Sequence, residues 1–523
     1  MRKFWNSSGY TPSHSNEDAA VQTSTATKRM ETLLVEENGL LRKVEDKGNH
    51  VYLMFLMFGI GALLPWNMFL NISHDYYTTF KLMDNGTGTP YSSNFQYSMT
   101  VAAQVPNLVF SFANIFLAAK YVRILCFFFQ SNVSRGDLTA RMRICLAIVQ
   151  AMVAITMVFI YIDTSDFIAT FYYVTLLSIV FLNAANGLFQ NSLFGLASSF
   201  PFKYTNAILI GQNFCGTVVS LLALLTKVVA NNIESRAVLY FGLASIAIIT
   251  CFILLNVIKK SAYFKRFDVV EANAYSDFEG EITTWEDIRI VFSRSKMQFA
   301  NIFFLFFVTL SLFPSICMYV LAVKTGEAYD FIISEMYFMD VGTFLNFNLF
   351  AFLGSLSANY VRLVSKLPVE YIQKSLIFQF GPKTIWIAVA VRVWFLFYFP
   401  SANYFPPQSE RIYGPVFEST WFFILNVTLM AFSSGYLSSL IMMYAPRAHD
   451  EPRIQRMAGM IAAFFLIAGV VSGLVFAWGI SLIVTDPLTI VPVIETIMAN
   501  GTAATTVVPV IVSTIAPTTA IVP

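Results

Sequence analysis

Polar side chains inside strongly apolar segments are the residues of this sequence whose type and spacing could do chemistry. Trp66 and Asn67 lie in one apolar run, Asn186 and Gln190 lie in a second, and Gln212 lies in a third. Hydrocarbon offers an amide no hydrogen-bond partner, so such side chains face protein or a wet cavity and mark a pathway. An aromatic ring beside amides suits a flat, hydrogen-bonding ligand, and hydrogen bonding between helices is the alternative interpretation.

The first of these runs reads GIGALLPWNMFL from Gly59 to Leu70. Leu63, Trp66, Asn67 and Leu70 are spaced i, i+3, i+4 and i+7, so they share one helical face. The proline of the run, Pro65, removes one backbone hydrogen bond, and its two glycines permit close helix packing. We expect the proline and the glycines to shape the helix and Trp66 and Asn67 to face the pathway.

Other reactive chemistry is not indicated by the sequence. It contains no nucleophile–base constellation, metal-ligand cluster or GxxxxGK[ST] pattern, so we expect neither an enzyme nor a bound cofactor. The five cysteines lie in or beside apolar segments and are expected to be small core residues. Intramembrane charge is limited to Arg392, to Asp340 near a span's outer end and to Lys227, which can snorkel. Facilitated diffusion is the simplest mechanism that remains.

The elements that must position these side chains are membrane-spanning helices. The chain has 523 residues, of which 56% are hydrophobic and only 12% charged, whereas soluble domains carry about 25% charged residues. This composition predicts an all-α polytopic membrane protein, and a net charge of +2 suggests no nucleic-acid partner. Stretches of roughly 20 mostly apolar residues predict eleven transmembrane helices near 51–71, 95–118, 143–162, 167–199, 205–230, 236–258, 298–322, 332–361, 382–400, 415–445 and 457–484.

Positive charge predicts the orientation, because cytoplasmic loops carry an excess of Lys and Arg. If the N-terminus is inside, the outer segments hold only Lys81, Arg236, Lys324 and Arg411 out of 33 basic residues. We therefore predict an N-terminus inside and a C-terminus outside. The glycosylation sequons at Asn85 and Asn500 fall on the predicted outer side.

The charged stretch 259–296 separates six predicted spans from five. The expected organisation is a cytoplasmic tail (1–50), a six-helix bundle (51–258), a cytoplasmic linker (259–296), a five-helix bundle (297–484) and an extracellular disordered tail (485–523). A proline in the first span, Pro65, and one in the seventh, Pro314, hint at repeated halves. We expect a monomer in the plasma membrane, with an endosomal or lysosomal membrane as the alternative suggested by a partial dileucine pattern at 31–34.

Several ordered motifs resemble the equilibrative nucleoside transporter family. The run GIGALLPWNMF from Gly59 resembles the family's first-span motif, and FQNSLFGLA from Phe189 resembles its fourth-to-fifth-span block. Further similar motifs cover about 50 to 484: Gly211-Gln212, Leu312-Phe-Pro314, Phe347-Asn348 with Gly354, Arg392, Ser434-Gly-Tyr-Leu437 and Ala458-Gly459 with Phe464-Phe465.

The resemblance implies a major-facilitator-like fold of six and five helices around a central cavity, working by alternating access. It implies that Leu63 and Trp66 line the nucleobase side, with Leu70 and Met99 nearby, and that Gln190 hydrogen-bonds the base. Asn186 stands where many relatives have glycine. The implied function is facilitative transport of nucleosides or nucleobases.

The eighth span departs from the family's pattern, FNxxDxxGR. Here Asn348 is followed by Ala351 and Ser355 in place of the acid and the base. A site built around a ribose would lose selectivity without those groups. Asp340 lies eleven residues before Ala351, close to the same helical face, so it is a candidate to supply the charge at another depth. Two alternatives stay open: a family member that moves organic cations such as monoamines, and a membrane receptor or scaffold that has lost transport.

Overall fold

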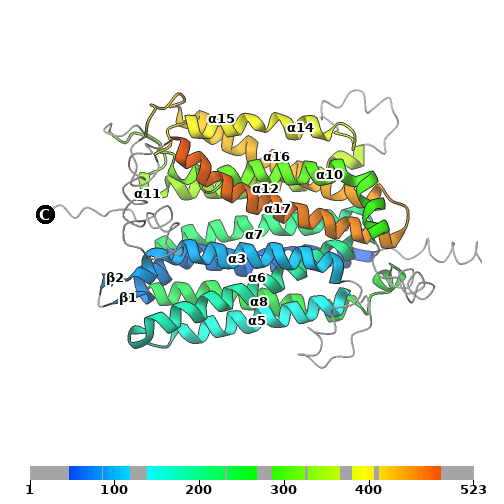
Figure 1. Ribbon diagram of the computed structural model, residues 1–523, viewed down its shortest axis with the longest axis horizontal. Coiled ribbons are helices and arrows are strands. Elements are labelled where there is room, and N and C mark those ends of the chain that lie inside the picture. The colour runs from blue at the N-terminus through cyan, green and yellow to red at the C-terminus, as the bar shows by residue number, and fades with distance from the viewer. Residues whose placement is uncertain are drawn as a thin grey trace, which may run out of the picture.

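The fold is described from a computed structural model. It covers residues 46–84, 86–117, 138–229, 232–267, 285–323, 328–364, 380–405 and 411–484. Residues 1–45 of the predicted N-terminal tail, the predicted C-terminal tail, the sequons at Asn85 and Asn500 and the partial dileucine pattern lie outside these residues. The described chain is almost wholly helical, as Figure 1 shows.

The long helices follow the order that the apolar segments predict. The first six helical rods are α2 (His50–Ile72), α3 (Pro90–Leu117), α5 (Leu138–Ile160), α6 (Ile168–Ser198), α7 (Phe202–Val229) and α8 (Ile233–Ile258). The next five are α10 (Trp285–Leu312), α12 (Asn346–Val364), the pair α14 (Ile385–Val391) and α15 (Val393–Ser401), α16 (Thr420–Arg447) and α17 (Pro452–Val484). Smaller elements are η1 (Lys47–Asn49), η2 (Ser73–Lys81), η3 (Ser165–Phe167), η4 (Cys317–Tyr319), α11 (Glu335–Phe338), η5 (Met339–Leu345) and the hairpin of β1 (Met83–Asp84) with β2 (Thr87–Gly88).

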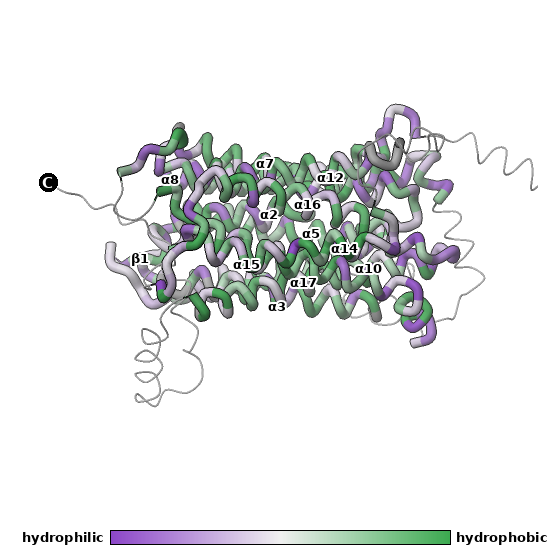
Figure 2. Tube along the Cα trace, turned by 90° about the horizontal axis from the view of Figure 1, so that it is seen from above, coloured by the Kyte–Doolittle hydropathy of each residue, from purple (hydrophilic) through white to green (hydrophobic). Residues whose placement is uncertain are grey.

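The molecule has the surface of a membrane protein. Among the described residues, nine helical segments are long and apolar enough to cross a bilayer. Large apolar side chains such as Val158, Ile246 and Phe397 are more than half exposed on these rods, which water would penalise and lipid does not. Figure 2 shows hydrophobic residues along the middle of the rods and hydrophilic residues gathered toward both ends. The all-α polytopic membrane class is thus confirmed, whereas the count of eleven spans and the orientation stay predictions.

Among the described residues, two of the predicted spans are not covered by a helix that is both long and apolar enough to cross a bilayer. Helix α3 is long enough, but polar side chains are spread along its length. The ninth predicted span is interrupted at Arg392, where α14 ends and α15 begins. Helix α10 begins at Trp285, inside the segment predicted as a linker. The sequence places the start of this span later because the first turns of α10 are charged and do not have the composition of a membrane segment. Glu286 and Asp287 nevertheless favour a helix, since acidic side chains stabilise a helix N-terminus.

The rods form two groups that lie side by side (Figure 1). Helices α2, α3, α5, α6, α7 and α8, which we call the six-helix group, pack mainly on one another. Helices α10, α12, α14, α15, α16 and α17, together with α11 and η5, form the second group, which we call the C-terminal group. The groups meet along two seams, where α17 packs on α3 and α6 and where α12 and α16 pack on α7. The predicted bundle boundaries remain a prediction.

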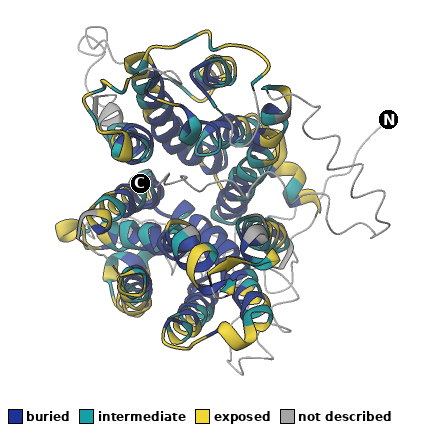
Figure 3. Cartoon of the chain, turned by 90° about the vertical axis from the view of Figure 1, so that its left-hand side faces the viewer, coloured by how far each residue is buried: buried dark blue, intermediate teal, exposed yellow. Residues whose placement is uncertain are grey.

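The ends of the molecule differ in how the groups are joined. We call the end that carries β1 and β2 the hairpin end, and the end where α8 finishes and α10 begins the linker end (Figure 1). At the linker end one continuous apolar core includes side chains of both groups, among them Phe194, Ala458 and Ile461. At the hairpin end the C-terminal group has a separate core built around Phe347, Tyr398 and other residues of that group alone. Figure 3, seen from the hairpin end, shows the buried sides of the rods facing inward.

The described cysteines are core residues. Cys145, Cys215, Cys251 and Cys317 are all buried and free. Their environment is apolar, which suits a small side chain with a weak donor. The core prediction is confirmed for these four, and Cys126 lies outside the described residues.

Candidate functional site

The polar side chains of the first, fourth and fifth rods meet in one place. The Asn67 amide of α2 donates to the Cys215 sulfur of α7 at 3.6 Å, and the Gln212 amide of α7 donates to the Gln190 oxygen of α6 at 3.4 Å. Gln212 and Cys215 are three residues apart, so both contacts lie on one face of α7. We call these four residues the amide cluster. The Gln212–Gln190 contact is longer than the usual 2.7–3.2 Å for N–H···O, so these amides are loosely bound and can exchange partners at low cost.

Glycines bring α2 and α7 close enough for this cluster to form. A Cβ at Gly59 would lie 2.2 Å from the Ile208 carbonyl oxygen, and one at Gly211 would lie 2.1 Å from the Leu56 oxygen. Both distances are far below van der Waals contact, so any side chain there would push the helices apart. Pro65 lies buried inside α2, which continues through it without a break. The expectation that the glycines serve packing therefore agrees with the structure.

The apolar residues predicted beside the cluster have unequal exposure. Leu63 and Trp66 of α2 are half-buried and pack against the core, whereas Leu70 is 39% exposed. Met99 is fully buried on α3, and Asn186 is buried on α6 one turn from Gln190. Leu63 and Trp66 are thus partly accessible on the helix that carries Asn67, whereas Met99 would need a rearrangement to reach a ligand.

A second polar feature runs along the seam between α7 and the segment η5–α12. Four residues of α7, spaced seven apart, contact this segment: Asn206, Asn213, Ser220 and Lys227. A seven-residue repeat keeps one helix face toward a packed neighbour. We call these residues and their partners the polar ladder. Its partners on the other helix are Asn359, Ser355, Asn348 and Asp340, so the two elements run antiparallel over their whole length.

Ser355, which replaces the basic residue of the family's pattern, is built into this ladder. It is fully buried, and its hydroxyl accepts from the Asn213 amide at 2.6 Å and donates to the Gly435 carbonyl of α16 at 3.1 Å. The Asn206 amide donates to the Ser355 carbonyl at 3.0 Å. In this arrangement the one proton of the Ser355 hydroxyl is already used, so the group has no donor to offer a ligand.

Ala351 and Asn348 also make close contacts with protein. A Cβ at Gly435 would lie 1.9 Å from the Ala351 carbonyl oxygen, because α12 and α16 touch through their backbones here. The Asn348 amide donates to the Ser220 hydroxyl at 2.9 Å and to the Phe344 carbonyl at 3.0 Å. Their predicted role in substrate binding remains a prediction, which requires these contacts to open.

The two charged residues of the eighth and ninth predicted spans, Asp340 and Arg392, have different surroundings. The Asp340 carboxylate lies 2.5 Å from the Lys227 ammonium of α7. Arg392 is 2% exposed and donates to the Met430 carbonyl at 2.9 Å, to the Thr309 hydroxyl at 2.6 Å and to the Ser433 hydroxyl. Arg392 therefore ties α10 and α16 together at the break between α14 and α15.

Comparison with known proteins places the chain in a family. The sequence model described as "Nucleoside transporter" matches residues 176–482, which is more than half of the chain. The chain belongs to the nucleoside transporter family. Membership of a transporter family agrees with the prediction that the protein is not an enzyme.

Individual relatives within the family are distant but similar over nearly their full length. "Equilibrative nucleoside transporter 1" of Homo sapiens is 26% identical over 466 residues, covering 83% of this chain and 97% of the relative. "Equilibrative nucleotide transporter 1" of Arabidopsis thaliana is 23% identical, covering 88% of this chain and 92% of the relative.

A solved structure of a Major Facilitator Superfamily transporter, FucP, in the outward conformation is 10% identical to this chain. It aligns with a TM-score of 0.44, covering 83% of this chain and 96% of FucP. The major-facilitator-like arrangement predicted from the sequence stays a prediction.

The polar ladder is the feature that inspection of single residues missed. Asn213 and Lys227 attract attention separately, one as a polar residue in a span and the other as a lysine able to snorkel. The seven-residue spacing from Asn206 through Asn213 and Ser220 to Lys227 was the available signal. Such spacing predicts a continuous polar face toward one partner helix, although it does not identify the partner.

Proposed function

We propose that this protein is a facilitative carrier of neutral nucleosides, or of their nucleobases, and that it works by alternating access. Family membership is the observation on which this proposal chiefly rests. The amide cluster supports it, because hydrogen-bonding amides meet at the junction of α2, α6 and α7, and the half-buried indole of Trp66 is next to Asn67 in α2.

The chemistry of the cluster suits a nucleobase. A carboxamide has both donors and an acceptor, so Gln190 and Gln212 can match a base edge that also presents both. The flat face of Trp66 offers an apolar stacking surface for an aromatic ring. The loose Gln212–Gln190 contact, at 3.4 Å, is the contact that a base would replace.

The cluster favours a neutral solute over a cation. Its four side chains are three amides and a thiol, so a cation that entered would lose water without gaining a carboxylate from them. Asp340 is paired with Lys227, which neutralises its charge within the polar ladder. We therefore favour nucleosides over monoamines.

Uptake measurements test the function directly. Radiolabelled uridine, adenosine, adenine and serotonin would be offered to nucleoside-transport-deficient cells expressing the protein, at two pH values. We expect saturable uridine or adenosine uptake and no serotonin uptake. Serotonin uptake without uridine uptake would overturn the proposal in favour of an organic-cation transporter, and silence across the panel would favour a receptor or scaffold.

A substitution in the cluster tests the site. Gln190→Leu should raise the KM for uridine about 2- to 12-fold, because one hydrogen bond contributes about 0.5–1.5 kcal/mol. Gln150→Leu is the matched control, since the Gln150 amide donates to the Ser245 hydroxyl on α8 at 2.7 Å, away from the cluster. An unchanged KM in Gln190→Leu, or an equal change in both variants, would remove Gln190 from the proposed site.

The remaining expectations form part of the same proposal. We propose that the carrier is a plasma-membrane monomer with its linker end in the cytoplasm and its hairpin end outside. Surface biotinylation and the accessibility of tags at the two termini test the location and the orientation. Retention of the protein in internal vesicles would favour an endosomal or lysosomal carrier.

A further inference from the structure

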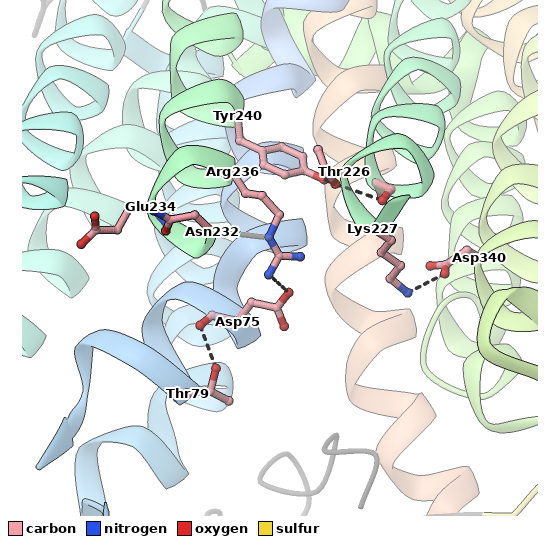
Figure 4. A network of polar contacts seen from close by, with 10 residues as sticks. Asp75, Thr79, Thr226, Lys227, Asn232, Glu234, Arg236, Tyr240 and Asp340 are labelled. Carbon is pink, nitrogen blue, oxygen red and sulfur yellow. Dashed lines mark hydrogen bonds and ion pairs between the residues drawn. The ribbon is translucent and has the colours of Figure 1, made fainter. Parts of the chain in front are cut away.

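Among the described residues, the ion pair of Lys227 and Asp340 joins the two groups of helices at the hairpin end. Lys227 lies in the last turn of α7, and its Nζ is 2.5 Å from the Asp340 Oδ2 of η5 (Figure 4). Lys227 belongs to the six-helix group, whereas Asp340 belongs to the C-terminal group. The contact therefore breaks if the two groups separate at this end.

The rest of the hairpin end holds the groups together weakly. The C-terminal group has its own apolar core here, which includes no side chain of α7. The neighbouring contact across the seam is also polar, between the Asn348 amide and the Ser220 hydroxyl, seven residues before Lys227. At the linker end, by contrast, the groups share one apolar core. Polar contacts between the groups can be exchanged for contacts with water at small cost. The hairpin end is therefore the end at which we expect the two groups to separate.

Each partner of the pair is anchored within its own group. Next to Lys227, the Thr226 hydroxyl lies 3.3 Å from the Tyr240 hydroxyl of α8, which ties the end of α7 to the six-helix group (Figure 4). Asp340 is buried in η5, a π-helical segment, and Thr343 of the same segment donates to the Cys317 carbonyl at 3.4 Å. π-helical turns occur frequently at functional sites.

We propose that the Lys227–Asp340 ion pair is the latch of the hairpin end, which forms when this end closes during the transport cycle and breaks when it opens. The proposal rests on the carrier function proposed above. The Lys227 side chain is 36% exposed and the Asp340 side chain 11%. A pair with one partner in water is weak enough to break and re-form in each cycle. Lys227 and Asp340 act as positioning residues, since they set the distance between the groups rather than contact the solute.

A thiol-accessibility experiment tests the latch without requiring transport. Ser220→Cys, in a Cys126→Ser background, places a reporter behind the pair, and the four described native cysteines are buried. Intact cells are treated with a membrane-impermeant methanethiosulfonate reagent. Lys227→Met with Asp340→Asn removes the pair without changing net charge, and should speed modification up to about 5-fold, the range of a weakly held ion pair.

Two further variants distinguish a specific effect of the Lys227–Asp340 ion pair from a general destabilisation of the helix packing. Exchanging the charges, Lys227→Asp with Asp340→Lys, should restore the slow rate. Arg236→Met with Asp75→Asn removes an ion pair of the same end at 2.8 Å (Figure 4). This pair joins α8 to η2, which packs on α2, α3 and α8 of the six-helix group, so its loss should leave the rate unchanged. The latch is rejected if the neutral double variant reacts at the parental rate, if the exchanged pair reacts as fast as the neutral one, or if the control pair gives the same acceleration.

Uridine uptake in the same cells separates the two proposals. Uptake by the parental protein together with an unaltered thiol rate would reject the latch alone. Absence of uptake together with the expected thiol rates would reject the carrier function and leave the closure of the hairpin end established.

Discussion

Replacing Gly435 by alanine should separate α12 from α16 and destabilise the protein. The added Cβ would lie 1.9 Å from the Ala351 oxygen and 3.0 Å from the Ser355 nitrogen. A carbon normally approaches a carbonyl oxygen to about 3.3 Å, so the helices must move apart by about 1.4 Å. Backbone atoms form this contact, and they cannot swing aside as the end of a flexible side chain could.

The energetic cost follows from two terms. Overpacking of this kind costs about 1–3 kcal/mol. The Ser355 hydroxyl donates to the Gly435 carbonyl at 3.1 Å, and a displacement of that size breaks the bond at a further cost of about 0.5–1.5 kcal/mol. The total is about 1.5–4.5 kcal/mol.

The assay is the apparent melting temperature of purified protein in detergent, followed by size-exclusion fluorescence. We expect Gly435→Ala to melt at least about 3 °C below the parental protein, taking roughly 2 °C per kcal/mol as in larger domains. Gly242→Ala in α8 is the matched control, because a Cβ there meets nothing within 4 Å. That control should be neutral or stabilising, since alanine favours a helix over glycine. If Gly435→Ala melts with the parental protein, the close packing of α12 on α16 is refuted.

Two further predictions concern buried charge and pH. Arg392→Lys should lower the apparent melting temperature, because an ammonium cannot reach acceptors on both α10 and α16, and each hydrogen bond from a charged group contributes about 1.5–3 kcal/mol. The exposed Arg289→Lys should not change it. His449 lies in the turn after α16 and has a lowered pKa. Its burial is the main cause and the nearby Arg294 guanidinium the second, whereas Asp450 acts in the opposite direction. As the pH falls below about 6.5, His449 therefore becomes protonated in the unfolded chain before it does in the folded protein. The free energy of unfolding should decline over the pH range between that value and the pKa of the folded protein, and it should decline less in His449→Gln.

The positions of most helices could be predicted from the sequence, because a long apolar stretch favours lipid and the polar residues that separate two such stretches favour water. The start of α10 at Trp285 could not, since that helix continues beyond the apolar stretch into charged turns. Composition marks the part of a helix that suits lipid, whereas the helix itself ends where its backbone hydrogen bonds end.

Part of the candidate site was also accessible from the sequence. Asn67, Gln190 and Gln212 stand out because amides are costly in hydrocarbon, and Trp66 stands out as the aromatic residue next to Asn67. In the structure Asn67 donates to Cys215, and Gln212, three residues before Cys215 on α7, donates to Gln190. The sequence also showed that Ala351 and Ser355 lack the charges of the family's pattern. It could not show that Asn213 and Gly435 occupy the Ser355 hydroxyl, because that requires three helices at one depth.

The sequence by itself determined the membrane class, the order of the helices and the family resemblance that the later comparison confirmed. These properties depend on local composition and on short motifs. Only the tertiary structure decided that Lys227 meets Asp340, 113 residues away, rather than snorkelling to water. It also decided that the groups share an apolar core at one end only. Such contacts depend on the relative depth in the membrane and the relative rotation at which distant helices pack. Neither quantity can be obtained from the sequence of one helix alone.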